Sequence, residues 1–104
     1  MQPALDLFRA LADPSRLRIM ALVRSMELSI GELAEVLGQS QPRVSRHVRI
    51  LAEAGLCERR KEGSWVFLGL GEEARTAPVL AALDGWAQLD PADRWSEADM
   101  ARLA

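Results

Sequence analysis

Hydrophobic residues near the amino terminus recur at helical spacing. Apolar positions three and four residues apart over residues 5–12 predict an amphipathic helix that ends near residue 12. Asp13 and Pro14 then offer a capping carboxylate and a first-turn proline, so a second helix is expected from Pro14 to Arg24. Apolar side chains cover most of the circumference of this second helix, which predicts that it lies at the centre of the core.

Two further helices are predicted on either side of a short turn. The segment Ser29–Glu32 has the form of a capping box, and a third helix is expected over Ile30–Leu37, with Gly38 ending it. Ser40 is placed to cap a fourth helix that runs to about Ala54. Two helices joined by about three residues form a helix-turn-helix.

Beyond the fourth helix the spacing changes to that of short strands. Strands are predicted over residues 57–61 and 64–70, joined by a turn at Glu62–Gly63, and such a hairpin beside a helix-turn-helix is a wing. Thr76–Pro78 is typical of a helix start, and the last predicted helix continues to about Leu89. The predicted fold is therefore mainly α with a small β-hairpin: a winged helix-turn-helix with four helices, two strands and a final helix.

The length of 104 residues is sufficient for one modest core. Residues 1–89 are expected to form one DNA-binding and dimerisation domain. Residues 90–104 are expected to form a tail or the start of a connector helix, with Ser96 as cap and Met100 and Leu103 as apolar positions. The chain has no apolar run near the roughly 18 residues that a membrane span needs and no secretion signal, which indicates a soluble cytoplasmic protein that does not contact a membrane.

Charge is unevenly distributed along the chain. The formal net charge is -2, yet residues 39–61 contain six basic and two acidic side chains, a local charge of +4. Residues 72–104 contain three basic and seven acidic side chains, a local charge of -4. The basic segment is a candidate phosphate-facing surface.

The fourth predicted helix has an apolar side and an arginine side. Val48 and Leu51 lie within about 40° of Val44 around the helix axis, whereas Arg46 lies near 200°. A merely solvated charged face is the alternative, but the preceding turn, the shortage of acid before Glu53 and the basic hairpin favour DNA contact. The predicted DNA-binding residues are Ser40, Gln41, Arg43, Ser45, Arg46, His47 and Arg49 of the helix, with Arg60 and Lys61 of the hairpin.

These side chains differ in the contacts that they are suited to make. Gln41 suits bidentate recognition of adenine, and Arg43 or Arg46 suits either guanine or phosphate. The short or neutral donors suit phosphate or base edges, and the two hairpin cations suit an adjacent backbone or the minor groove. His47 is the single histidine and has no convincing partner ligands, which favours a hydrogen-bonding role over a metal site.

Several spaced motifs together resemble those of the ArsR/SmtB family of bacterial repressors. They are Leu7–Ile19, Ser40–His47, Glu53–Leu56 and Glu62–Phe67, and the resemblance covers roughly residues 5–70. It implies a homodimer in which the first and last helices pair and bring two recognition helices to a palindromic operator of double-stranded DNA. The implied dimer residues are Leu5, Phe8, Val79, Leu83 and Trp86; the alternative is that they only complete the core of the monomer.

The resemblance also implies where a metal would bind, and the chain departs from the family there. Many members use a Cys-x-Cys pair at the start of the third helix, where this chain has Ser29–Gly31. A second common site uses aspartate and histidines on the last helix, but Asp84 has no histidine near it in the sequence. No metal or other cofactor is therefore expected, Cys57 is interpreted as a packing residue rather than a redox sensor, and the sequence does not name an inducer.

Residues 27–47 also look like the ArsR-type domain that precedes an S-adenosylmethionine-dependent methyltransferase domain in some bacterial fusion proteins. The alternative function is therefore an amino-terminal regulatory or dimerisation module of such a polypeptide. The chain itself has no glycine-rich cofactor loop and no catalytic constellation, so it is not expected to be an enzyme.

Overall fold

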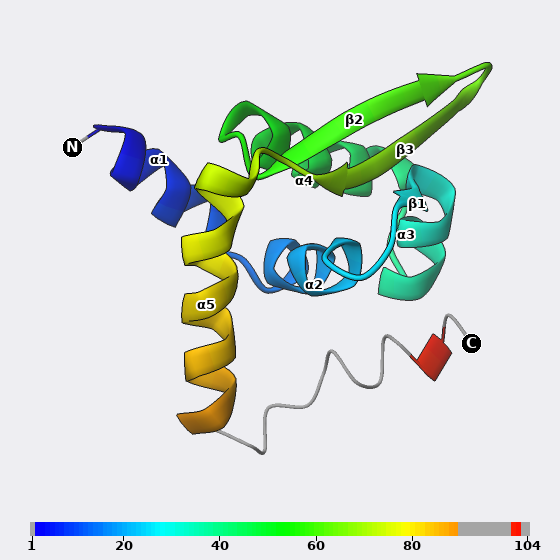
Figure 1. Cartoon of the computed structure of the whole chain (residues 1–104). Coiled ribbons are helices and arrows are strands. Elements are labelled where there is room, and N and C mark those ends of the chain that lie inside the picture. The colour runs from blue at the N-terminus through cyan, green and yellow to red at the C-terminus, as the bar shows by residue number, and fades with distance from the viewer. Residues whose placement is uncertain (1, 90–100, 103–104) are drawn as a thin grey trace.

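The computed structural model describes residues 2–89 and 101–102 of the chain. The described part contains five helices and a three-stranded sheet, with the helices grouped around α2 and the β2–β3 hairpin extending away from them (Figure 1). The elements, in order, are α1 (Gln2–Leu11), α2 (Pro14–Val23), β1 (Leu28–Ser29), α3 (Ile30–Leu37), α4 (Gln41–Glu53), β2 (Cys57–Glu62), β3 (Trp65–Leu70) and α5 (Glu73–Leu89).

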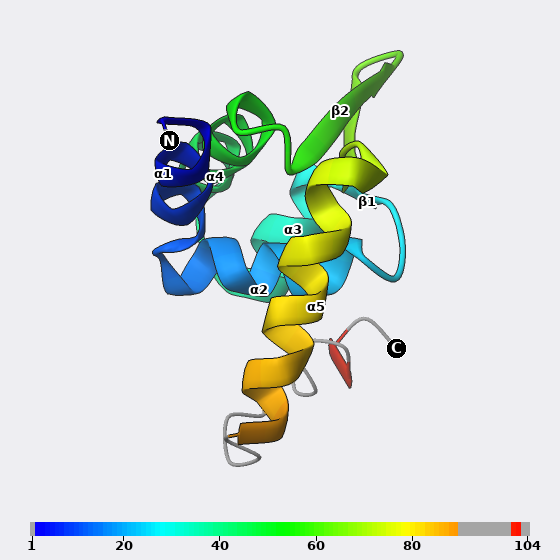
Figure 2. The ribbon, with the colours of Figure 1, turned by 60° about the vertical axis from the view of Figure 1, so that its left-hand side comes forward.

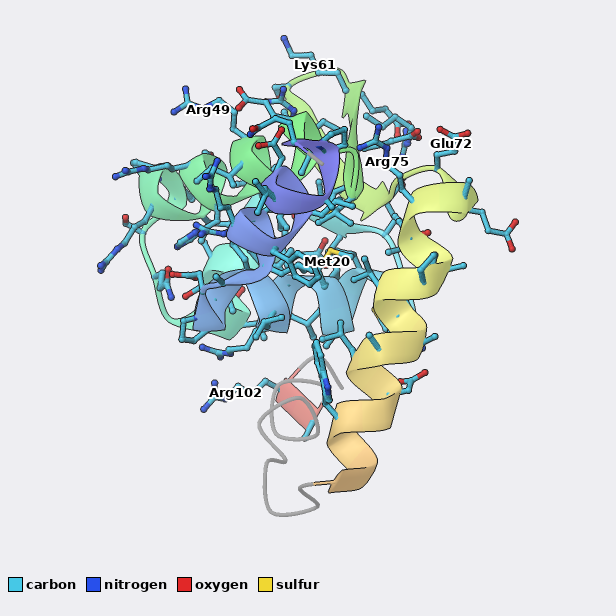
Figure 3. The ribbon with its side chains drawn as sticks, turned by 90° about the vertical axis from the view of Figure 1, so that its left-hand side faces the viewer. Met20, Arg49, Lys61, Glu72, Arg75 and Arg102 are labelled. Atoms are coloured by element: carbon cyan, nitrogen blue, oxygen red, sulfur yellow. The ribbon has the colours of Figure 1, made fainter. Side chains whose placement is uncertain are left out.

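Helix α2 lies at the centre of the core, as its apolar circumference predicts. Its residues Ile19, Met20 and Leu22 are fully buried, and the helix packs against α1, α3, α4 and β3. Met20 lies in the middle of the molecule among these elements (Figure 3). The burial of α2 fixes the position of the other helices around it.

The two helices of the predicted helix-turn-helix begin at the predicted caps. The Ser29 hydroxyl accepts a hydrogen bond from the Glu32 amide at 3.1 Å, and the Glu32 carboxylate accepts one from the Ser29 amide at 2.9 Å. Gly38 ends α3 in the left-handed conformation, and the Ser40 hydroxyl accepts from the Arg43 amide at the start of α4. The capping box and the helix-turn-helix are both confirmed.

The sheet contains one strand more than the sequence predicts. The two residues of β1 pair antiparallel with β3, so the strand order is β1-β3-β2, and β3 is central. The hairpin turn is at Gly63–Ser64, one residue later than predicted, with Gly63 at φ 60°. The β2–β3 hairpin is the wing, and the winged helix-turn-helix is as predicted.

Helix α5 begins earlier than the sequence predicts. It starts at Glu73 rather than at Thr76–Pro78, so Pro78 lies inside the helix. Proline has no N–H to donate to the carbonyl of Ala74 and is ordinarily unfavourable beyond the first turn. Helix α5 nevertheless continues past Pro78 to Leu89. The helix crosses the body of the molecule beside α2 and extends beyond it (Figure 2).

The predicted tail helix, with Ser96 as cap, lies outside the described residues apart from residues 101–102. Among the described helices, none combines the length and the hydropathy that a membrane crossing requires.

Candidate nucleic-acid interface

Helix α4 divides into the two sides that the sequence predicts. Val44, Val48 and Leu51 are buried in the core. The exposed side carries Gln41, Arg43, Ser45, Arg46 and Arg49. These polar and basic side chains are therefore free to meet a partner in solution.

Five cations on α4 and the wing have no ionic partner within the described part of the chain. They form no side-chain hydrogen bond or ion pair there, and they are Arg43, Arg46, Arg49, Arg59 and Lys61. Arginines elsewhere are engaged: Arg24 donates to both carboxylate oxygens of Asp84, at 2.7 and 3.0 Å. We call the five unpaired cations the basic face.

The wing divides its cations between its two sides. Side chains alternate along a strand, so Arg59 and Lys61 lie on the side of β2 that carries the buried Cys57, and Arg60 lies on the other. The α4 helix packs against β2, so the side of Arg59 and Lys61 is the one near the predicted DNA-contacting helix. Arg59 was not among the predicted contacts, although strand alternation in the sequence pairs it with Lys61.

Arg60, a predicted DNA contact, has other partners in the structure. Its guanidinium donates to Glu27 at 2.5 Å and to Glu62 at 2.7 Å, and it lies 4.9 Å from the centre of the Phe67 ring. The hydrogen bonds to both carboxylates raise the pKa of Arg60, and the same contact lowers the pKa of Glu27. The positive charge of Arg60 is thus largely balanced within the protein, unlike that of Lys61.

His47 faces the start of α2 rather than the exposed side of α4. Its side chain is 15% exposed, and its Nδ1 lies 3.2 Å from the Arg16 guanidinium and 3.8 Å from the Asp13 carboxylate. Burial lowers the pKa of His47; the Asp13 charge acts in the opposite direction, and the charges of Arg16, Arg43 and Arg46 add to the lowering. His47 therefore joins α4 to α2, and this position leaves it little surface for a DNA contact.

The two positions where the family resemblance implies metal ligands are both engaged in protein contacts. Ser29 is 2% exposed and caps α3, while the Asp84 carboxylate on α5 is held by Arg24. Within residues 2–89 and 101–102, no group of three or more His, Cys, Asp or Glu side chains is placed to hold a metal ion. Neither position offers a ready set of ligands.

The predicted dimer residues fall into two groups. Leu5, Phe8 and Trp86 are exposed, whereas Val79 and Leu83 are half-buried against the core. Helices α1 and α5, which carry them, face the same side of the molecule (Figure 3). The exposed three are available to a partner, and the other two support the core of the single chain.

Comparison with known proteins places these features in a family. A family model described as "Bacterial regulatory protein, arsR family" matches residues 13–59, from the start of α2 into the wing. The arsenic resistance transcriptional regulator ArsR1 of Pseudomonas putida is 40% identical over 98 residues, which are 93% of this chain and 74% of that protein. The chain belongs to the ArsR family.

Other ArsR relatives match over smaller parts of their length. The arsenical resistance operon repressor of Escherichia coli is 46% identical over 63 residues, which cover 60% of this chain and 54% of the repressor. These relatives are transcriptional regulators, in agreement with the prediction that the chain is a DNA-binding regulator and not an enzyme.

Two solved structures show the same fold as this chain. The homodimeric winged helix-turn-helix DNA-binding domain of Mb0332 from Mycobacterium bovis superimposes with a TM-score of 0.76 at 25% identity, covering 84% of this chain and 80% of that one. HlyU from Vibrio cholerae superimposes with a TM-score of 0.72 at 32% identity, covering 86% and 92%. The winged helix-turn-helix arrangement of α3, α4 and the wing is thus shared with the Mycobacterium bovis DNA-binding domain.

Proposed function

We propose that this ArsR-family protein is a repressor that binds a palindromic operator as a homodimer, with α4 in the major groove of each half-site. The observation that carries the proposal is the basic face: its five cations lack carboxylate partners in the described structure, while Arg24 and Arg60 have them. Unpaired cations on one exposed surface are what phosphate binding requires.

Base recognition is assigned to the amino-terminal half of α4. Gln41 and Arg43 lie in its first turn and Arg46 one turn later, and all three are exposed. Glutamine pairs with adenine and arginine with guanine through two hydrogen bonds each, and each such pair contributes roughly 1–3 kcal/mol of discrimination. Phosphate contacts on either side of these bases are assigned to Arg49, Arg59 and Lys61.

The dimer is proposed because the Mycobacterium bovis domain is homodimeric and because α1 and α5 expose apolar residues on one side of this chain. Two copies related by a two-fold axis would present two α4 helices to two half-sites. The proposal also locates this DNA-binding regulator in the cytoplasm, where its operator would lie.

The test begins with DNA selected by the protein itself from a random-sequence pool, because the operator is unknown. Binding to the enriched duplex is measured by fluorescence anisotropy over a range of salt concentrations. Affinity should fall steeply with salt, and Arg46→Ala should lower it by roughly tenfold or more. Arg9→Ala is the matched control, since it removes the same charge from an exposed arginine of α1 that pairs with Asp6.

Enrichment of no sequence, or equal affinity of Arg46→Ala and the wild type, would contradict the proposal. Half-site duplexes test the palindrome, because the dimer should bind the full site far more tightly than either half.

The proposed repressor does not use either of the common metal sites of its family. The contacts of Ser29 and Asp84 described above support this, and so does the absence of a thiolate at the start of α3. Thermal unfolding with zinc and with arsenite tests it: neither should raise the Tm, because a ligand that binds the folded state would stabilise it. A Tm that rises with concentration of either would contradict this part of the proposal.

The methyltransferase alternative stays a prediction. The relatives described above are transcriptional regulators, and they do not bear on such a fusion. A stop codon directly after Ala104 in the natural reading frame would contradict it.

A further inference from the structure

Trp65 is a large aromatic side chain on the surface of the wing. It begins β3 directly after the hairpin turn and is 61% exposed. Its ring stacks on that of Phe67, with ring centres 6.5 Å apart and 26° between the planes, so one part of the indole is supported by the protein and the rest faces water. An exposed aromatic ring held in a fixed place next to a binding surface is a candidate contact.

Two hollows adjoin Trp65, and they differ in charge. The first is lined by Ser29, Glu32, Glu62, Trp65 and Phe67, so it has two carboxylates and repels an anion. The second has a volume of about 370 Å³ and no charged side chain in its lining. The residues that line the second hollow are Ser29, Ile30, Gly31, Gln41, Ser45, Ser64, Trp65 and Val66.

Cations of the basic face flank the second hollow on both sides. Gln41, Ser45 and Arg49 follow one another at four-residue intervals on α4, so Arg49 continues the row of side chains that lines the hollow. On the wing, Lys61 pairs with Val66, which also lines it. Both cations point outward on the side of the molecule that carries α4 and the wing (Figure 3).

We propose that one sugar–phosphate strand of the DNA passes through this second hollow, with the Trp65 indole packed against a deoxyribose. A deoxyribose offers an apolar face to the ring, and the adjoining phosphates suit the Ser45 and Ser64 hydroxyls and the flanking Arg49 and Lys61. The inference rests on the proposed function, because it requires α4 to lie in the neighbouring groove. The wing would then contact DNA through the uncharged Trp65 ring as well as through its cations.

The test compares variants on the duplex that the wild-type protein selects. Trp65→Ala should lower affinity by roughly tenfold, because the complex loses the apolar contact between the indole and the deoxyribose, and Trp65→Phe should retain most of the affinity. The slope of affinity against salt should be unchanged by Trp65→Ala but should decrease by about one for Lys61→Ala, since only the lysine displaces a counterion. Met26→Ala is the control, because Met26 is also an exposed apolar side chain but lies before β1, outside the lining of both hollows.

A hydroxyl-radical footprint separates contact from a purely structural role. The wild type should protect a few deoxyriboses beside each major-groove contact, and Trp65→Ala should lose protection at those sugars alone. Circular dichroism and the Tm verify that the variant is folded.

Wild-type affinity and an unchanged footprint for Trp65→Ala, with binding lost in Arg46→Ala, would overturn the inference and leave the proposed function standing. Wild-type affinity in both variants would overturn both. A folded Trp65→Ala protein that is monomeric where the wild type is dimeric would assign the ring to a second copy of the chain and would also overturn the inference.

Discussion

His47, the single histidine of the chain, lies at the contact between α4 and α2. Arginine has only hydrogen-bond donors, so the Arg16 guanidinium at 3.2 Å requires Nδ1 of His47 to be an acceptor and the ring to be neutral. Burial lowers the pKa of this ring in agreement with that hydrogen bond. Protonation of His47 would remove the acceptor for Arg16 and therefore weaken the contact between α4 and α2.

The first prediction is that the His47 ring titrates below its ordinary pKa of 6.5 in the folded protein. The depressed pKa contributes stability that is present above pH 6.5 and is lost as the pH falls through the folded pKa, because the unfolded chain then binds the proton more readily. NMR titration of the tag-free protein measures this pKa from one ring signal. The same loss of Tm on acidification in wild type and His47→Gln, or a measured pKa above 6.5, would contradict the prediction.

Cys57 is the second residue whose chemistry follows from its position. The thiol is 2% exposed at the start of β2, its Sγ lies 3.6 Å from Sδ of Met20, and burial raises its pKa to about 12. We predict that iodoacetamide does not label the folded protein at neutral pH, since the reactive thiolate is scarce and covered. Mass spectrometry should detect labelling only after urea is added; rapid labelling of the native protein would instead support a redox role.

At the scale of whole elements, the join between the wing and α5 depends on a close backbone approach. The Gly71 amide donates to the Leu56 carbonyl at 2.9 Å, and a Cβ on Gly71 would collide with the carbonyl oxygen of Gly55. The atoms that this Cβ would meet belong to the backbone of Gly55 and Leu56, so no side-chain rotation relieves the overlap. The same join places Arg75 of α5 so that it donates to the Ala54 carbonyl at the end of α4, at 3.1 Å.

We therefore predict that Gly71→Ala lowers the free energy of unfolding by about 2–3 kcal/mol. Urea unfolding followed by circular dichroism measures the loss. Gly31→Ala is the matched control: its Cβ would meet the Gln41 side chain at an ordinary 3.6 Å, so the change should stay within about 0.5 kcal/mol. Equal stability of the two variants would contradict the prediction and show that the backbone between β3 and α5 can shift to accommodate the Cβ.

Sequence patterns predicted most elements because their signals are local. The caps at Asp13, Ser29 and Ser40 each bond an amide three residues on, so spacing alone locates them. The two-residue β1 has no such pattern, because it is a strand only through its pairing with β3. The start of α5 was misplaced because Pro78 is typical of a first turn and here lies in the second.

The candidate site was predictable to a similar extent. The exposed side of α4 follows from helical periodicity, and the structure agrees at Arg43, Arg46 and Arg49. Glu27, which binds Arg60 together with the nearby Glu62, and Arg16, which binds His47, are both distant in the sequence. Local patterns therefore do not distinguish Arg60 and His47 from the unpaired cations. Strand alternation places Trp65 and Phe67 on one face of the second wing strand, but it does not predict the exposure of Trp65, which depends on how the wing lies beside α3 and α4.

At the scale of the whole molecule, α1 and α5 leave apolar surface uncovered. Phe8 is 65% exposed and Trp86 is 57% exposed, and the helices that carry them face one side (Figure 3). Exposed aromatic rings on two helices that face the same side are typical of a surface that another chain covers. The alternative for the predicted dimer residues is that they only complete the core of one chain. It applies to Val79 and Leu83, which pack against that core.

We predict that Phe8→Glu and Trp86→Glu each convert the proposed dimer into a monomer, because a carboxylate buried in an apolar contact without a partner loses its hydration. Sedimentation velocity should show the wild type and Met26→Glu as dimers, since Met26 is exposed but lies on the loop before β1. Affinity for the full palindrome should then fall by about a hundredfold or more in the two monomeric variants, while half-site affinity stays near that of the wild type. If Phe8→Glu and Trp86→Glu remain dimeric with full operator affinity, the two recognition helices must be brought together by a different surface, and the role assigned here to α1 and α5 is wrong.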